Sequence, residues 1–436
     1  MSEIQNRRFS DQYWNFLKNS PLLLEEIKKG AFNREKNKGI STQKDIAKQL
    51  QENSWERHFE KGFPHFTFLG LRITTNCNLA KRCKYCDQEE VRNKLGMQDW
   101  KNIIDEATEK GKRKGINISI SGGEPLLFGD FLYGDNGLIK YASKRGGIVN
   151  VNTNFHLLTP QVATSLIKSG LNALHVSLDA PNEAIHDELE NVGTFRRVWE
   201  SIYLMRKAKH VTNSEHPTLF INTVATKRNI GHFDKLLESL LVRGKFSEDD
   251  FENSLYELAP QLVLLGGEEN VKLRPNEKDW NSFMKETWPN ACEVWEKFQD
   301  KYKIPKEKRI SLSERSFFAN PFTRVRHDQN INDVIKNFTK GDYGATSLCD
   351  ECYASPTQAY VLANGDVYQC GSLADTNSKP IGNILETSSI REIVKQGFDS
   401  QYKSLGRNNP HCMGCYGSTL KINQDIEKIL KSNHHK

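Results

Sequence analysis

Short β-rich runs alternate with helical stretches between residues 66 and 270, and this alternation constrains the fold more than any other feature of the chain. The runs are FTFLGLRIT, INISISG, GIVNVNTN, LNALHVSLDA, TLFINTVAT and PQLVLLGG. Strands that alternate with helices build a parallel sheet, and the active sites of such sheets lie at the carboxyl ends of the strands. We therefore expect an α/β fold with its functional residues directly after the strands.

Three cysteines, Cys77, Cys83 and Cys86, follow the first run in the stretch CNLAKRCKYC. A structural metal is closed by four protein ligands, whereas a catalytic metal keeps one position open. Three thiolates in a loop at a strand end therefore predict a cubane [4Fe-4S] cluster whose fourth iron binds another ligand.

The remaining chain divides into four regions. Residues 1–65 are expected to form a helical N-terminal extension, and residues 271–345 are charged and mainly helical. Residues 346–418 hold five of the nine cysteines around the β-like run AYVLANGDVYQC, and residues 419–436 are a polar tail. We expect residues 66–270 to be the catalytic core and residues 346–418 to be a small α+β domain.

The composition favours a soluble cytoplasmic protein. Its 61 Lys and Arg residues are interspersed with 55 Asp and Glu residues, so the net charge of +6 gives no clustered footprint for nucleic acid. The longest apolar runs are too short to cross a bilayer, and the first residues lack the apolar stretch of a secretory signal. In a reducing cytosol, clustered cysteines hold metal rather than disulfides.

The loop CNLAKRCKYC and the motif GGEP at residues 122–125 resemble the radical S-adenosylmethionine (SAM) family. The family's loop often reads C-N-L-x-C-x-Y-C, and this chain repeats its named positions with two further residues between the first two cysteines. The positions are Cys77, Asn78, Leu79, Cys83, Tyr85 and Cys86. The resemblance implies a partial (β/α)6 TIM-like barrel with SAM bound at the open iron of the cluster.

The resemblance also implies a set of cofactor contacts at the strand ends. The set consists of Tyr85, Gly122, Gly123, Glu124, Pro125, Asn154, Ser177 and Asp179. In the family, the GGEP motif hydrogen-bonds the amino group of the methionine moiety, and Ser177 matches a cofactor contact. Asn154 and Asp179 stand where the ribose and the carboxylate of SAM are expected, although the capping of turns explains each of them equally well.

One position departs from the family pattern. Many relatives carry H-D-x-x-R after the fourth strand, with the arginine near the cofactor carboxylate, whereas the stretch IHDELEN has Glu190 there. A carboxylate does not pair with a carboxylate, so this clamp is either absent or supplied by Lys227 or Arg228 after the next strand.

The C-terminal cysteines resemble the twitch domain, the shortened form of the SPASM domain that is appended to radical SAM enzymes. The matching pattern is Cys352, Gly365, Cys370, Cys412 and Cys415. The resemblance implies that its four thiolates close a second [4Fe-4S] cluster. Zinc is the alternative, because Cys349-x2-Cys352 and Cys412-x2-Cys415 have the spacing of two zinc knuckles.

Cys349 is left over if Cys352 is the ligand. It is then either an incidental thiol or a hydrogen-atom donor that quenches the substrate radical, because an S–H bond is weaker than most C–H bonds. Spacing alone also allows Cys349 to ligate the cluster in place of Cys352.

The resemblance implies that the reduced enzyme cleaves SAM to a 5'-deoxyadenosyl radical, which abstracts hydrogen from an unactivated C–H bond. A peptide is the expected substrate, for oxidative modification, crosslinking or epimerisation, and a small molecule such as a sugar or a nucleoside is the alternative. A noncatalytic protein that binds zinc and nucleic acid is a more remote alternative. We expect a flavodoxin or ferredoxin as the electron donor, since an acidic partner suits a basic chain.

Overall fold

The structure is a computed structural model of the 436-residue chain. It describes residues 12–16, 18–30, 66–79, 83–86, 88, 90–243, 258–265, 270–315, 320–324, 329–343, 352, 357–374 and 378–401. In these ranges no helix is both long enough and apolar enough to span a bilayer.

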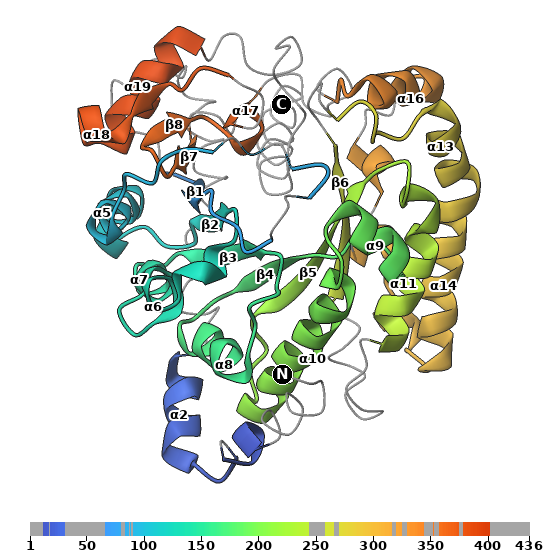
Figure 1. Ribbon diagram of the computed structural model, residues 1–436, viewed down its shortest axis with the longest axis horizontal. Coiled ribbons are helices and arrows are strands. Elements are labelled where there is room, and N and C mark those ends of the chain that lie inside the picture. The colour runs from blue at the N-terminus through green and yellow to red at the C-terminus, as the bar shows by residue number, and fades with distance from the viewer. Residues whose placement is uncertain are drawn as a thin grey trace, which may run out of the picture.

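The described strands form one nine-stranded sheet in the order β6-β5-β4-β3-β2-β1-β7-β8-β9. They are β1 (Phe68–Thr74), β2 (Asn117–Gly122), β3 (Ile148–Thr153), β4 (Ala173–Ser177), β5 (Thr218–Ala225), β6 (Leu258–Leu264), β7 (Gln358–Leu362), β8 (Asp366–Tyr368) and β9 (Gly382–Asn383). Neighbouring strands from β6 to β7 are parallel, and the β7–β8 and β8–β9 pairs are antiparallel. Figure 1 shows β1–β6 as an open arc, which confirms the expected α/β fold with a partial barrel.

Helices connect the parallel strands and lie mainly along the outer side of the arc (Figure 1). They are α5 (Met97–Ala107), α6 (Asp130–Tyr133), α7 (Leu138–Lys144), α8 (Pro160–Lys168), α9 (Glu183–Leu189), α10 (Thr194–Thr212) and α11 (Phe233–Arg243). Because neighbouring strands from β1 to β6 are parallel, all their carboxyl ends lie at one rim. The segments after β1, β2, β3 and β4 therefore meet there.

The period-2 pattern of the strands gives the sheet two different faces. Leu69 and Leu71 of β1, and Ile118 and Ile120 of β2, are fully buried in one apolar core that the helices share. The positions between them point to the other face and include polar residues such as Ser119. Burial of the apolar face stabilises the barrel, while the inner face is left with polar groups.

The N-terminal residues pack on the outside of this barrel. Helix α2 (Pro21–Gly30) lies against α8, and both Trp14 and Ile27 are buried in the main core. The hydroxyl groups of Tyr13 and Thr164 are 2.7 Å apart and form a hydrogen bond. Packing against α8 and α10 therefore anchors this helical segment to the barrel.

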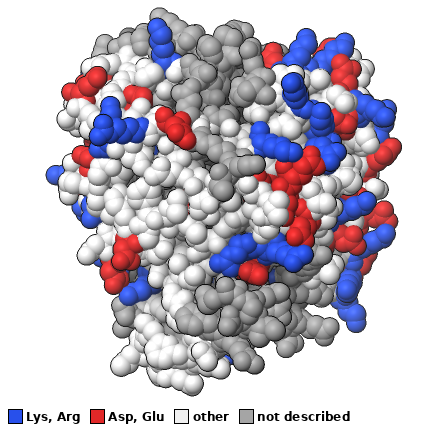
Figure 2. Space-filling model, in the orientation of Figure 1, with Lys and Arg blue, Asp and Glu red and all other residues white. Residues whose placement is uncertain are grey.

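A second apolar core lies beside β6 and α11. It is built by α13 (Glu277–Ser282), α14 (Trp288–Lys301), α15 (Leu312–Arg315) and α16 (Ile331–Lys340), with a π-helical turn over Phe283–Thr287. Its large buried side chains include Trp280, Phe283 and Phe338. Figure 2 shows charges of both signs over this side of the molecule, so the helices are amphipathic, with charged outer surfaces.

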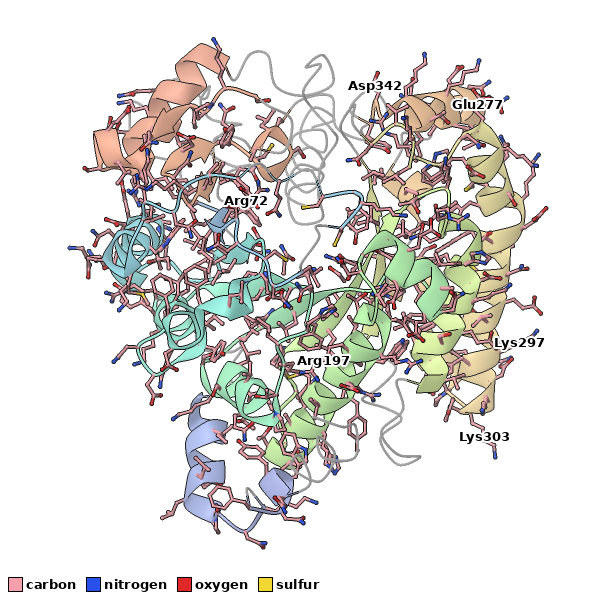
Figure 3. The ribbon with its side chains drawn as sticks, in the orientation of Figure 1. Arg72, Arg197, Glu277, Lys297, Lys303 and Asp342 are labelled. Carbon is pink, nitrogen blue, oxygen red and sulfur yellow. The ribbon has the colours of Figure 1, made fainter. Side chains whose placement is uncertain are left out.

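The C-terminal region continues the sheet rather than forming a separate layer. β7 pairs with β1 in parallel, and Tyr360 lies opposite Gly70. A Cβ atom on Gly70 would stand 2.1 Å from the Tyr360 ring, so the glycine makes room for that ring. The Arg72 guanidinium lies over the same ring, 5.4 Å from its centroid (Figure 3).

Helices α17 (Gly371–Ala374), α18 (Ile384–Thr387) and α19 (Ile390–Gln401) complete the described C-terminal region. The Glu106 carboxylate of α5 accepts hydrogen bonds from the Ser389 hydroxyl at 2.6 Å and from the Ile390 amide at 2.9 Å. It also accepts one from the Arg391 amide at 3.2 Å. An anion at the N-terminus of α19 satisfies free amide groups and complements the helix dipole, so it fixes this helix to the barrel.

Candidate active site

The cysteine loop begins where β1 ends. Cys77 and Cys83 are half-buried, Cys86 is exposed, and all three are free thiols. The Cys86 amide donates to the Cys83 carbonyl at 2.9 Å, which closes a turn, and the Lys84 amide donates to the Leu189 carbonyl at 2.8 Å. Residues 80–82, which contain the two additional positions of the loop, lie outside the described residues.

The chemistry of these three thiols fits an iron–sulfur cluster. Burial raises the pKa of Cys77 and of Cys83, and the carboxylates of Glu190 and Asp179 raise the pKa of Cys83 further. Such thiols stay protonated without metal, and coordination removes the proton. Three soft donors on one short loop, two of them half-buried, match the donor set of a [4Fe-4S] cluster with one open iron.

The glycines of GGEP allow the end of β2 to touch this loop. The Gly123 amide donates to the Thr74 carbonyl at 2.9 Å, and the Glu124 amide donates to the Asn76 carbonyl at 2.8 Å. A Cβ atom on Gly123 would lie 2.1 Å from the Asn76 carbonyl oxygen. Gly122 has a φ of 151° and equally little space, because its Cβ would lie 2.3 Å from the Thr74 carbonyl oxygen.

The Glu124 side chain joins the ends of β2 and β3. Its carboxylate accepts hydrogen bonds from the Leu126 amide at 2.9 Å, the Thr153 hydroxyl at 2.8 Å and the Asn154 amide at 2.7 Å. Burial raises its pKa to about 7. Three protein donors thus bind this carboxylate, and the contacts of GGEP with the amino group of SAM remain a prediction. Pro125 is buried at the start of the helical turn that follows.

Asn154 both caps a turn and contacts the cysteine loop. Its side-chain carbonyl accepts from the His156 amide at 3.1 Å. Its side-chain amide donates to Asn78 Oδ1 at 2.8 Å and to Cys77 Sγ at 3.6 Å. The structure therefore gives Asn154 the capping role and also places it next to a predicted cluster ligand, where N–H···S hydrogen bonds tune the potential of a cluster.

Tyr85 and Asp179 come together with His186 of α9 and with Glu190, which directly follows that helix. The Tyr85 hydroxyl donates to Asp179 Oδ2 at 2.5 Å and lies 3.4 Å from Glu190 Oε1. His186 Nε2 is 3.5 Å from Glu190 Oε2, and His186 Nδ1 accepts from the Asp179 amide at 3.1 Å. Ser177, at the end of β4, lies half-buried opposite Asn222 and two residues before Asp179.

Asp179, His186 and Glu190 have ligand atoms within 4.8 Å of one another, yet they do not fit a metal site. Because His186 Nδ1 accepts a backbone hydrogen bond, the neutral ring carries its proton on Nε2, the atom that a metal would need. Burial lowers the pKa of His186 to about 4, which keeps the ring neutral. Burial and the neighbouring Asp179 raise the pKa of Glu190 well above its ordinary value.

Of the two cations suggested as substitutes for the missing arginine, Arg228 forms an ion pair at the surface. The Arg228 guanidinium donates to Glu188 Oε2 at 3.1 Å and 2.5 Å, and about half of its side chain is exposed. Lys84 also pairs with Glu188, at 3.4 Å. Arg228 is therefore engaged at the surface, and the Lys227 backbone is tied to Leu273.

The structure adds residues that the sequence alone did not single out. Gln88 Nε2 donates to the Gly122 carbonyl at 3.0 Å, a contact between the cysteine loop and GGEP. Arg197 of α10 donates to the carbonyl groups of His156 and Leu158, each at 2.7 Å, and so supports the turn after β3 (Figure 3). An arginine that donates to a carbonyl group about forty residues away leaves no local sequence pattern that would reveal it.

Two of the C-terminal cysteines lie among the described residues. Cys352 and Cys370 are half-buried, and Cys370 stands between β8 and α17. Gly365 has a φ of 95° in the turn between β7 and β8, a conformation that favours glycine. Cys349, Cys412 and Cys415 lie outside the described residues, so their part in a second cluster stays a prediction. Cys292 packs against the second apolar core.

Comparisons with known proteins agree with this site. Residues 71–240 match the model of the Radical SAM superfamily, and residues 349–416 match SPASM, an iron–sulfur cluster-binding domain. The AdoMet-dependent heme synthase of Methanosarcina barkeri is 26% identical over 358 residues, which cover 80% of this chain and 90% of that protein. The mycofactocin maturase MftC of Mycolicibacterium smegmatis is 28% identical over 180 residues, 41% of this chain and 42% of that protein.

Among solved structures, Streptococcus suis SuiB bound to the precursor peptide SuiA has a TM-score of 0.51 and 18% identity, covering 81% of this chain and 72% of that one. This likeness supports the fold. A radical SAM domain uses SAM and a [4Fe-4S] cluster, and a SPASM domain adds further iron–sulfur clusters. A noncatalytic zinc protein is thereby excluded. The chain belongs to the radical SAM superfamily of enzymes and carries a C-terminal SPASM domain.

Proposed function

We propose that this enzyme binds a [4Fe-4S] cluster through Cys77, Cys83 and Cys86 and uses SAM to abstract hydrogen from an unactivated C–H bond of a peptide. The observation that carries the chemistry is the contact between the three-thiol loop and GGEP at adjacent strand ends. When bound, the cluster and SAM together supply the 5'-deoxyadenosyl radical. The protein supplies the positions of the donors and excludes water.

Several residues of the rim position the cysteine loop, each through a different contact. Gly122 and Gly123 allow β2 to approach the loop, and Glu124 ties that contact to the end of β3. Asn154 directs a hydrogen-bond donor at Cys77 Sγ, which stabilises the thiolate form. These contacts hold the loop before any cofactor is present, so binding SAM requires little rearrangement.

A peptide is the proposed substrate, for oxidative modification, crosslinking or epimerisation. One relative is named a maturase, and SuiB, which shares the fold, was solved with a precursor peptide. The support for a small molecule is the heme synthase, which this chain matches over 90% of its length. A small molecule, such as a sugar or a nucleoside, is therefore the second candidate.

The catalytic proposal is tested with anaerobically reconstituted protein. Two cubanes correspond to about eight irons per chain. Replacing Cys77, Cys83 and Cys86 together by Ala should remove about half of the iron and all reductive cleavage of SAM. Cys292→Ala, a thiol on α14, is the matched control and should change neither. SAM cleavage by the triple variant would refute the assignment of these ligands.

The substrate class is tested by following deuterium. Perdeuterated cell extract of the organism that encodes the chain is incubated with enzyme and unlabelled SAM, and deuterium in 5'-deoxyadenosine is measured. Digestion of the extract with proteinase K followed by dialysis should abolish the transfer if the substrate is a peptide. Transfer from the dialysable fraction of untreated extract would instead identify a small molecule.

Two further features belong to the same proposal. Cys352, Cys370, Cys412 and Cys415 would hold the second cluster, and a flavodoxin or ferredoxin would deliver the electron. The net charge of +6 attracts an acidic donor. SAM cleavage driven by such a donor should weaken as salt rises, whereas cleavage driven by dithionite should not. Equal salt dependence of the two would contradict electrostatic docking.

A further inference from the structure

Four side chains meet below the second half of the cysteine loop, and we name them the Tyr85 clamp: Tyr85, Asp179, His186 and Glu190. They come from the loop, from the end of β4 and from the end of α9. We propose that Asp179 and Glu190 hold the Tyr85 hydroxyl so that the turn from Cys83 to Cys86 is fixed, which makes Tyr85 a positioning residue for the cluster.

Asp179 is the rigid part of this clamp. Its side chain is buried, and its Oδ1 accepts from the Val224 amide at 2.8 Å while its Oδ2 accepts from Tyr85. Its own amide donates to His186, and its carbonyl accepts from Asn229 Nδ2 at 2.8 Å. Every polar group of Asp179 thus has a protein partner, so its position is determined by β4, β5 and α9 together.

Glu190 supplies the second side of the clamp. It follows α9 directly, is buried, and lies with one oxygen 3.4 Å from the Tyr85 hydroxyl and the other 3.5 Å from His186 Nε2. The preceding carbonyl, of Leu189, accepts the Lys84 amide at 2.8 Å. The end of α9 therefore meets the loop twice, once through the backbone and once through Glu190.

The identity of residue 190 matters for this contact. An arginine at this position would stand near the Asp179 carboxylate and pair with it, because a guanidinium binds a carboxylate through two parallel hydrogen bonds and a phenol through only one. It would thereby compete with Tyr85 for the same acceptor. Glutamate leaves Asp179 to the tyrosine, so the departure from the H-D-x-x-R pattern and the Tyr85 contact have one explanation.

The length of the cysteine loop explains why the Tyr85 clamp is needed. The stretch between Cys77 and Cys83 contains five residues, two more than in the family motif. A longer closed segment has more conformations, and bringing its ends together costs more entropy. On the first side of this segment, Asn154 and GGEP hold Cys77. The Tyr85 clamp holds the second side, so both ends are fixed although the middle is longer.

The experiment compares Tyr85→Phe, which removes only the hydroxyl, with Tyr13→Phe. Tyr13 also makes a hydroxyl hydrogen bond, to Thr164, but it lies on the outside of the barrel. In the metal-free full-length chain, alkylation of each cysteine by iodoacetamide is followed by mass spectrometry. Tyr85→Phe should speed alkylation of Cys83 about tenfold, the effect of losing one charge-assisted hydrogen bond, and leave Cys77 unchanged.

Glu190→Gln provides the second arm, as a double-mutant cycle with Tyr85→Phe. Because both residues act through one contact, the double variant should alkylate at Cys83 no faster than the faster single variant. In reconstituted protein, Tyr85→Phe should keep its iron but need about tenfold more SAM for the half-maximal change in the EPR spectrum of the reduced cluster.

The inference is overturned if Tyr85→Phe alkylates at Cys83 at the rate of Tyr13→Phe. It is also overturned if the effects of Tyr85→Phe and Glu190→Gln multiply, since independent contacts would do so. The inference rests on the proposed cluster ligands, but the alkylation measurement needs no cluster. Failure of the proposed function would appear separately, as wild-type protein that binds no iron or does not cleave SAM.

Discussion

Replacing Gly123 by alanine should break the contact between GGEP and the cysteine loop. Its new Cβ atom would lie 2.1 Å from the Asn76 carbonyl oxygen, 2.5 Å from the carbonyl carbon and 2.7 Å from the Thr75 carbonyl oxygen. All three are backbone atoms, which do not move aside as a flexible side chain does. The two segments would have to separate by about 1 Å to restore ordinary van der Waals contact.

The magnitude follows from the two effects of this separation. Overpacking in a well-packed region costs about 1–3 kcal/mol. The separation also lengthens the hydrogen bonds from Gly123 to Thr74 and from Glu124 to Asn76, each of which contributes about 1 kcal/mol. We therefore expect Gly123→Ala to lower the free energy of unfolding by about 3 kcal/mol. Because Asn76 precedes Cys77, the variant should also lose iron from the first cluster.

Two glycines of the same chain serve as matched controls. A Cβ atom on Gly231 would meet no heavy atom within 4 Å, so Gly231→Ala tests the substitution alone. A Cβ atom on Gly193 would also stand in open space, but this residue has a φ of 84°, so Gly193→Ala tests backbone strain alone. Strain of this kind costs about 1 kcal/mol.

Urea denaturation followed by tryptophan fluorescence measures the stabilities, and iron analysis after reconstitution measures the cluster. The expected order of stability is Gly231→Ala, Gly193→Ala and then Gly123→Ala, with iron lost only in the last. Gly123→Ala within about 0.5 kcal/mol of Gly231→Ala, together with full iron content, would refute the steric reasoning.

Three further predictions follow from other contacts. Burial raises the pKa of Glu124 to about 7 from 4.5, so the folded protein binds this proton more tightly than the unfolded chain does. The stability that this group contributes is therefore fully present below pH 4.5. It falls by about 3 kcal/mol as the pH rises to 7. Urea titrations should show this loss in wild-type protein relative to Glu124→Gln, and parallel pH profiles would contradict it. Glu106→Ala should lower the free energy of unfolding by about 2 kcal/mol and increase amide hydrogen exchange in α19. Glu293→Ala, which changes an exposed glutamate on α14, is the neutral control. Unchanged exchange in α19 would contradict the proposal that Glu106 anchors this helix. Cys349→Ala should leave iron content and SAM cleavage unchanged; loss of about four irons would make Cys349 a ligand, and altered product stereochemistry would make it the hydrogen donor.

Local sequence patterns were sufficient for the core of the fold. The strands NISIS and VNVNT alternate because one face is buried under helices while the other lines the inside of the arc, and this period is written residue by residue. The motif GGEP was also interpretable, since close backbone approach requires residues without a Cβ atom. The structure adds the atoms approached, which are the carbonyl groups of Thr74 and Asn76.

Local sequence patterns do not specify contacts with partners far along the chain. The place of Arg228 after β5 suggests it as a substitute for the missing arginine, and the structure shows its pairing with Glu188 at the surface. Asp179 matched a cofactor position, and the structure shows both of its carboxylate oxygens bonded to protein donors, from Tyr85 and Val224. A strand-end position predicts which rim a side chain occupies but not which neighbour it contacts.

The parallel sheet, the rim at which the functional residues lie and the three thiols after β1 can be predicted from the chain, because periodicity and motif spacing are local properties. The pairing of β7 with the edge of β1, and the contact of Tyr85 with Asp179 and Glu190, become visible only in the folded molecule. The reason is physical: the residues of each contact are separated by long stretches of chain, and their pairing depends on the shape of the folded sheet and on which buried donors and acceptors must find partners.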